Sequence, residues 1–347
     1  MSDKIKTYFA DLRNEYPVLR AVFAVSLALV FATTVAYPAP HLTAILTMMF
    51  IGPGKQALGL KKEIIVPFLI YVLGSIGVFL GNSLIDYPLV ILPLLALAIF
   101  WSFKLVKIPA PIRLVFLMLV VLIPFNSITA NAIGGLILQV LLLNLIIALI
   151  IVKIAFALFP DKPISASDAK KKSAAPPNPL DMNKVALNGV LVIFPLVIMF
   201  YLFNATVGTL TLVFTIILGF DPFVYQSKKG LVIIAANILG GLFGVLAYQL
   251  LIIVPAYLFY IFLVLSVAFF FIINLFSTKK IAPVFATSFN TFIVIMGIIS
   301  TSTSGAGSEL WNRLFQIGIA IVYTTLAYLV VTAFNNPKIS AIETSPE

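Results

Sequence analysis

The chain has 347 residues, of which 62% are hydrophobic and only 10% are charged. Soluble domains average about 45–50% apolar and about 25% charged residues, so this composition excludes a soluble globular protein and predicts an integral membrane protein. With no cysteine and one histidine, the chain has no disulfides, thiolate metal sites or multi-histidine metal sites. The cations behind the net charge of +10 lie in short segments between apolar stretches. The expected partner is therefore the lipid bilayer and not nucleic acid.

Residues 1–17 are mostly polar and precede the first apolar stretch. They place Ile5, Tyr8, Phe9 and Leu12 at the spacing of one helix face. This pattern predicts a cytoplasmic amphipathic leader, a short helix on the membrane surface. A disordered leader is the alternative for the same residues.

Twelve apolar segments follow the leader, and most have the roughly 20 residues that a helix needs to cross a bilayer. They cover 18–37, 41–52, 64–84, 88–106, 114–129, 133–158, 185–203, 207–219, 231–253, 256–276, 284–299 and 314–334. The predicted fold class is an all-α polytopic membrane protein with about twelve transmembrane helices. The segments form two sets of six, at 18–160 and 185–334. A polar cytoplasmic linker (161–184) separates the sets, and a cytoplasmic tail (335–347) ends the chain.

The lysines and arginines predict the orientation of the chain in the membrane. With the N-terminus in the cytoplasm, 21 of the 22 lie on the cytoplasmic side, as the positive-inside rule requires. Both termini are then cytoplasmic. The exception is Arg313, which would attract an anionic substrate near the exit or pair with Glu309 one helical turn earlier.

The two sets of six segments align with each other. At an offset of 167 residues, glycines, a proline and a lysine pair recur in order: Gly52/Gly219, Lys61/Lys228, Lys62/Lys229, Gly74/Gly241, Gly77/Gly244 and Pro88/Pro255. Gln139 matches Gln316 at an offset of 177, after intervening loops. Six spans are an even number, so the two repeats are parallel, related by a pseudo-twofold along the membrane normal. For the glycines, close helix packing is favoured over a functional role.

Several local motifs resemble those of a known family: Tyr37-Pro38-Ala39-Pro40, Gly52-Pro53-Gly54, Asp86-Tyr87-Pro88-Leu89-Val90, Leu122-Ile123-Pro124 and Phe156-Ala157-Leu158-Phe159-Pro160-Asp161. Together with the six-span set, they resemble the fusaric acid resistance / aromatic acid exporter superfamily. The chain is similar to a compact branch without the large cytoplasmic domains. The resemblance implies a multi-pass efflux protein of the bacterial inner membrane that works with a periplasmic adaptor of the membrane-fusion type. Because the linker is short, energy coupling or regulation housed in the family's cytoplasmic domains does not carry over.

The short segments 41–52 and 207–219 occupy equivalent positions, and each ends at a Gly/Pro break. Such paired interruptions indicate a transporter binding site. The alternative is that each segment is an ordinary span that continues through its Gly/Pro break. We expect a substrate path between the halves, bordered by these breaks and by intramembrane amides: Gly52, Pro53, Gln139, Asn144, Gly219, Asp221, Pro222, Asn290 and Gln316.

Each of these polar residues also has a structural interpretation. For the amides, hydrogen bonding between helices is favoured over substrate contact. Asp221 is the best carboxylate for proton coupling, and an exposed loop residue near Lys228 is the alternative. Aromatic residues on spans ten and eleven, Tyr257 and Tyr260 among them, would suit an aromatic substrate, although core packing or lipid contact explains most of them as well.

Three classes of function compete. The first is an efflux transporter for small amphipathic or aromatic compounds, including anionic ones. The second is a non-transporting membrane subunit that anchors an adaptor or secretion complex. A lipid-modifying enzyme ranks last, because the chain lacks paired carboxylates, a histidine cluster and a nucleophile–base pair. We therefore expect no enzyme activity, no catalytic residue, no metal and no cofactor. The sequence leaves the substrate, the driving force and a homo-oligomer open.

Overall fold

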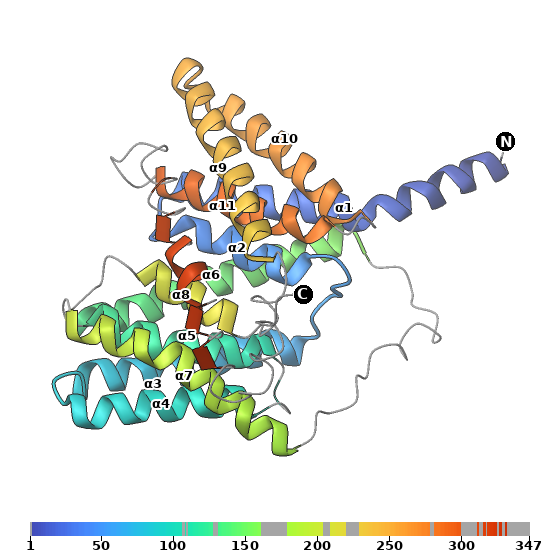
Figure 1. Cartoon of the computed structure of the whole chain (residues 1–347). Coiled ribbons are helices and arrows are strands. Elements are labelled where there is room, and N and C mark those ends of the chain that lie inside the picture. Colours follow the sequence, from blue (N-terminus) through green and yellow to red (C-terminus); the bar gives the residue numbers. More distant parts are fainter. Residues whose placement is uncertain are drawn as a thin grey trace, which may run out of the picture. The chain divides into compact units, whose positions relative to one another are not determined.

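The computed structural model describes residues 2–105, 108, 110–127, 131–160, 179–203, 209–219, 229–277 and 281–299, and scattered positions between 311 and 331. Every element in these ranges is a helix, in the order α1 (Ser2–Val35), α2 (Pro40–Ile51), α3 (Leu60–Ser83), α4 (Pro88–Lys104), α5 (Ala110–Ser127), α6 (Asn131–Leu158), α7 (Pro179–Phe203), α8 (Thr209–Gly219), α9 (Lys229–Ile253), α10 (Tyr257–Leu275) and α11 (Ala282–Ile299) (Figure 1). The predicted all-helical class is confirmed for this part of the chain.

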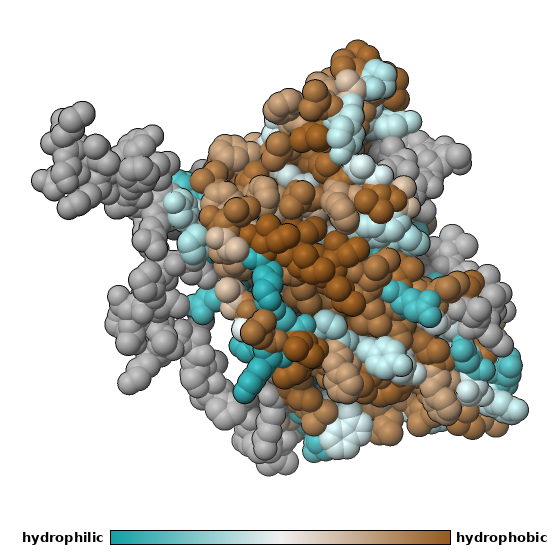
Figure 2. Space-filling model, turned by 180° about the vertical axis from the view of Figure 1, so that it is seen from behind, coloured by the Kyte–Doolittle hydropathy of each residue, from teal (hydrophilic) through white to brown (hydrophobic). Residues whose placement is uncertain are grey.

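Six helical stretches are long and apolar enough to cross a bilayer: Glu15–Val35, Leu60–Ser83, Ile133–Leu158, Met182–Phe203, Ala235–Ile253 and Tyr257–Leu275. Large apolar side chains also face outward, with Leu89 90%, Phe203 75% and Ile253 73% exposed. Figure 2 shows the resulting surface, on which hydrophobic residues dominate. An apolar surface of this extent belongs in lipid, so the described part is that of an α-helical membrane protein.

Helix α1 runs without interruption from the polar leader into the first apolar span. Pro17 lies inside it, at the junction of the two parts. The leader, predicted as a separate short helix, is therefore the beginning of the same helix as span one. The predicted linker 161–184 lies outside the described residues up to position 178, and its last residues begin α7.

The two segments predicted to be short are short helices in the structure. Helix α2 has 12 residues and α8 has 11, so each reaches only about 16–18 Å at 1.5 Å per residue. Pro40 occupies the first turn of α2, where its missing N–H requires no partner. At the other end, the N–H of Gly52 donates to the carbonyl of Met48, and helix resumes only at Leu60.

The chain divides into two compact units, and each combines helices from both halves of the sequence. Unit 1 comprises residues 1–67, 140–174 and 235–312, and unit 2 comprises 68–139, 175–234 and 313–347. Unit 1 thus takes α1 and α2 from the first half and α10 and α11 from the second. Unit 2 takes α4 and α5 from the first half and α7 and α8 from the second.

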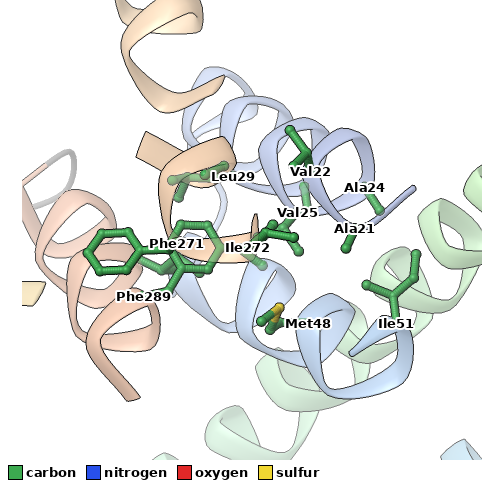
Figure 3. Close-up of a cluster of buried hydrophobic side chains, with 14 of the residues drawn as sticks. Ala21, Val22, Ala24, Val25, Leu29, Met48, Ile51, Phe271, Ile272 and Phe289 are labelled. Atoms are coloured by element: carbon green, nitrogen blue, oxygen red, sulfur yellow. The ribbon is translucent and has the colours of Figure 1, made fainter. Parts of the chain in front are cut away.

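In unit 1, α1 packs against α2 and α10, and α11 packs against α10 and α2. The core lies where these four helices meet (Figure 3). Leu29 of α1, Met48 of α2, Phe271 of α10 and Phe289 of α11 are each at most 6% exposed. The rings of Phe271 and Phe289 stack with centroids 5.6 Å apart. Small residues such as Ala28 on α1 let the helices approach closely.

In unit 2, α7 packs against α8 and α4, and α5 packs against α4 and α8. Its core draws Ile91 and Ile99 from α4, Leu117 from α5, Ile193 from α7 and Leu212 from α8, all fully buried. β-Branched and leucine side chains dominate this core, which also contains Phe103, Phe125 and Phe200, whereas the core of unit 1 has stacked phenylalanines.

Candidate functional site

The residues predicted to border a substrate path are divided between the two units. Gly52, Pro53, Asn144 and Asn290 belong to unit 1, whereas Gln139, Gly219 and Gln316 belong to unit 2. Asp221, Pro222 and Arg313 lie outside the described residues. Each unit is described by itself below.

In unit 1, Asn144 of α6 is the centre of a buried hydrogen-bond network. The hydroxyl of Thr43, on α2, donates to its Oδ1 at 2.6 Å, and its Nδ2 donates to the carbonyl of Pro38 at 3.1 Å and to that of Val140 at 2.8 Å. Tyr37 donates to the Thr43 oxygen, because the Thr43 proton already goes to Asn144. The amide is fully buried, and protein groups occupy both its donor and its acceptor. Helix-to-helix bonding therefore accounts for Asn144.

In unit 2, Gln316 receives an equivalent tie from a short helix. The hydroxyl of Thr211, on α8, donates to the backbone carbonyl of Gln316 at 3.3 Å. Both residues are buried, at 5% and 9% exposed. One threonine of each short helix, Thr43 in α2 and Thr211 in α8, is thus bonded to an amide residue from the sixth apolar segment of its own half.

A second threonine follows one turn later on each short helix. Thr47 on α2 and Thr215 on α8 are fully buried, and neither hydroxyl has a hydrogen-bond partner in the described part of the chain. A hydroxyl inside a helix commonly donates to the carbonyl four residues earlier, as Thr324 does to Ala320. Buried polar groups are nearly always bonded, so the unbonded hydroxyl in each short helix is a candidate polar site within its unit.

The remaining predicted residues differ in their surroundings. Gly219 is buried at the end of α8, where an added Cβ would meet Ile193 at 3.1 Å, and Gly52 is buried at the end of α2. The Oδ1 atom of Asn290 is buried and has no hydrogen-bond partner among the residues that the structure describes, although the residue as a whole is only half-buried. Gln139 and Pro53 are exposed.

The aromatic residues of spans ten and eleven form no single lining. Phe271, Phe289 and Phe292 are at most 1% exposed and pack in the core, whereas Phe262 is 64% and Phe269 46% exposed. Core packing and outward contact explain these rings. The exceptions are Tyr257 and Tyr260, whose hydroxyls bond to α1.

These two tyrosines border a cavity of about 500 Å³ in unit 1. Its lining comes from the end of α1, from the α9–α10 connection and from α11: Thr33, Thr34, Leu251, Pro255, Ala256, Tyr257, Tyr260 and Met296. Sequence reasoning singled out the tyrosines but missed Thr33 and Thr34. The available signal was the predicted repeat, because Phe200 and Tyr201 stand 167 residues after these two threonines.

No group of three acidic or histidine side chains that could hold a metal ion occurs among the residues that the structure describes. Comparison with protein-family models, with curated proteins and with solved structures gives no match to this chain. The function is therefore argued from the geometry of the chain itself.

Proposed function

We propose that this protein is a multi-pass transporter of the bacterial inner membrane that exports small amphipathic or aromatic compounds, in cooperation with a periplasmic adaptor. The proposal includes about twelve spans in two parallel six-helix repeats, with both termini in the cytoplasm. It also includes the resemblance to the fusaric acid resistance / aromatic acid exporter superfamily. Three features of the molecule support it.

The first feature is the helix pairing within the units. Each helix of unit 1 has a counterpart in unit 2: α7 for α1, α8 for α2, α4 for α10 and α5 for α11. Where two helices of unit 1 pack against each other, their counterparts in unit 2 also pack against each other. Two repeats of common origin would pack in this way, since equivalent helices keep equivalent neighbours. Internal repeats are the usual construction of secondary transporters, which favours transport over an anchoring role.

The second feature is a pair of glycines that the sequence alignment places at equivalent positions. An added Cβ on Gly77, in α3, would lie 2.5 Å from the carbonyl oxygen of Leu119 in α5. On Gly244, in α9, it would lie 2.9 Å from Ile295 in α11. Each glycine thus permits the third helix of its half to approach the fifth helix of the same half closely, α3 to α5 and α9 to α11. The recurring contact supports the repeat and assigns these glycines to packing.

The third feature carries the functional proposal. Each short helix ends at a glycine and bonds to an amide residue through one threonine, Thr43 or Thr211. One turn later, each has a buried threonine hydroxyl that has no hydrogen-bond partner in the described part of the chain. Short helices that end within a bilayer leave backbone carbonyls to be satisfied by protein or by a polar cavity. A matched pair of such helices is the expected pointer to a transport site.

The proposal is tested with a deletion strain challenged by a panel of aromatic acids, phenols and amphipathic drugs. We expect the deletion to sensitise cells to part of the panel and the wild-type gene to restore resistance. Asp221→Asn keeps the shape of the side chain and removes a proton-binding group, whereas Gln316→Leu removes an amide. We expect Asp221→Asn to fail in restoring resistance and Gln316→Leu to alter which compounds are exported.

Membrane insertion and expression of each variant are measured as controls. If the deletion changes resistance to no compound, and overexpression does not lower cellular accumulation of any, transport is rejected. Co-purification of a periplasmic adaptor in that case would favour the anchoring subunit instead.

A further inference from the structure

The cavity in unit 1 has a polar wall of four hydroxyl groups and an apolar floor. Met296, in the floor, is 3% exposed, while Tyr257, at the rim, is 56% exposed, so the cavity opens at one side. Five of its eight lining residues lie in the last turns of Glu15–Val35 and Ala235–Ile253 and in the first turn of Tyr257–Leu275. These are ends of apolar spans, where the hydrocarbon core of a bilayer meets its polar interface.

The directions of the hydrogen bonds determine what the polar wall offers to a ligand. The hydroxyl of Thr33 donates to the carbonyl of Leu29 at 2.9 Å, and that of Thr34 donates to the carbonyl of Val30 at 2.6 Å. Each threonine has only one proton. In the bonds of 2.8 Å between Tyr260 and Thr33 and 2.9 Å between Tyr257 and Thr34, the tyrosines are therefore the donors.

Both tyrosine protons are consequently engaged, and the lone pairs of the tyrosine oxygens remain available. The four side-chain hydroxyls of the wall accept hydrogen bonds and have no free proton to donate. None of the cavity's eight lining residues is charged. A carboxylate in the cavity would lose its hydration without gaining a side-chain donor or a cation, which is unfavourable. A neutral O–H or N–H group finds an acceptor there.

Comparison of the two aligned halves shows which residue differences leave space for the cavity in unit 1. At the positions that correspond to Thr33 and Thr34, unit 2 has Phe200 and Tyr201. Phe200 is 4% exposed and packs edge-on against Phe125, with ring centroids 6.3 Å apart, and the Tyr201 hydroxyl donates to the carbonyl of Ile85. Two aromatic rings thus pack at the place where unit 1 has two short side chains beside its cavity.

From this we infer that the cavity of unit 1 is a binding site for an uncharged aromatic molecule that donates a hydrogen bond, such as a phenol. The ring lies on Leu251, Pro255 and Met296, and the donor group faces the oxygens of Tyr257 and Tyr260. The role of this site in cells rests on the proposed export function. The inference restricts the substrates of that function to neutral hydrogen-bond donors and excludes anions.

Binding is measured with the full-length protein in lipid nanodiscs at pH 7, by equilibrium dialysis against three probes of matched size. The probes are 2-naphthol, a neutral donor; 2-methoxynaphthalene, which has no donor; and 2-naphthoate, an anion. Empty nanodiscs correct for partition into lipid. We expect saturable binding of 2-naphthol, weaker binding of the methyl ether by roughly fivefold, as one lost hydrogen bond predicts, and no saturable binding of the anion.

Two variants locate the site. Thr33→Phe with Thr34→Tyr fills the cavity with the residues that unit 2 uses, and we expect it to abolish saturable binding. Tyr257→Phe with Tyr260→Phe removes the two tyrosine oxygens and keeps the ring shapes. We expect it to reduce the preference for 2-naphthol over its methyl ether. Ser266→Ala, on the exposed side of α10, is the matched control that leaves binding unchanged.

The inference is overturned if 2-naphthoate binds more tightly than 2-naphthol. It is also overturned if the Thr33→Phe/Thr34→Tyr variant keeps the wild-type melting temperature and still binds 2-naphthol fully. If the Thr33→Phe/Thr34→Tyr variant fails to fold, the Tyr257→Phe/Tyr260→Phe variant still tests the inference. An unchanged preference of that variant for 2-naphthol over its methyl ether also overturns the inference. Resistance assays separate this inference from the export proposal. Export that persists in the filled variant rejects this site alone, whereas saturable binding without any export rejects the transport function alone.

Discussion

The hydroxyl of Thr43 donates a 2.6 Å hydrogen bond to the side-chain oxygen of Asn144, and both side chains are fully buried. The bond ties short helix α2 to α6, far along the chain. Replacing Asn144 by Leu leaves the Thr43 hydroxyl and the Pro38 carbonyl without this partner. We expect it to lower the stability of the folded protein by about 1–3 kcal/mol.

Thermal unfolding in detergent, followed by loss of monodisperse protein, measures this change. Gln139→Leu, on the same helix but at an exposed position, is the matched control and should unfold at the wild-type temperature. An Asn144→Leu protein as stable as the control would contradict the assigned network.

A second prediction concerns Arg20, a cation that is 2% exposed near the start of the first apolar span. Its guanidinium lies 3.9 Å from the ring centroid of Phe156 and donates to the carbonyl of Phe159 at 3.1 Å. Lysine cannot reproduce this stacked, planar arrangement. We expect Arg20→Lys to destabilise the protein by about 2 kcal/mol, the scale of a desolvated cation–π contact.

The ion pair between Lys153 and Glu63 supplies the control for Arg20. Its N···O distance is 3.0 Å, but the Lys153 side chain is 59% exposed. Exposed pairs contribute at most about 1 kcal/mol, so Lys153→Met should lower the melting temperature less than Arg20→Lys. A larger drop in melting temperature for Lys153→Met than for Arg20→Lys would show that the Arg20 contacts stabilise the protein less than the Lys153–Glu63 ion pair does.

A third prediction concerns topology, which the absence of native cysteine makes convenient to test. In intact cells, an impermeant maleimide should label Asp86→Cys, at the predicted outer end of span three. Lys170→Cys, in the predicted cytoplasmic linker, should react only after lysis. Labelling of position 170 from outside would reject the orientation derived from the positive-inside rule.

Sequence reasoning recovered the elements because hydropathy and helix length are local properties. It placed the short helices at 41–52 and 207–219, and the structure has them at Pro40–Ile51 and Thr209–Gly219. It did not recover how helices combine, since apolar faces look alike in one dimension and nothing in the sequence shows that α1 packs against α10 of the second half as well as against α2. The cavity was missed for a related reason: Thr33 and Thr34 are inconspicuous until α10 places two tyrosines against them.

A fourth prediction follows from the composition of the units. The core of unit 1 joins Leu29 of the first half to Phe271 of the second, and that of unit 2 joins Ile99 of the first half to Ile193 of the second. Fragments 1–170 and 171–347 should therefore be degraded when expressed singly and should co-purify when expressed together. A single half that is stable and monodisperse would contradict the mixed composition of the units.

The last prediction separates stability from transport at Thr47 of α2 and Thr215 of α8. Valine matches the shape of threonine and lacks the hydroxyl, and Thr47 and Thr215 bury a hydroxyl that has no protein partner in the described part of the chain. Removing an unsatisfied buried group relieves its desolvation penalty, so Thr47→Val and Thr215→Val should melt at or above the wild-type temperature.

If these hydroxyls serve the transport site, the same two variants should lose resistance in cells despite their stability, as expected where a functional site keeps an unfavourable polar group. Thr43→Val is the matched control, because its hydroxyl is fully engaged with Asn144. It should lower the melting temperature instead. Valine variants at 47 and 215 that are both stable and fully protective would assign the two hydroxyls to packing and remove the short helices from the transport site.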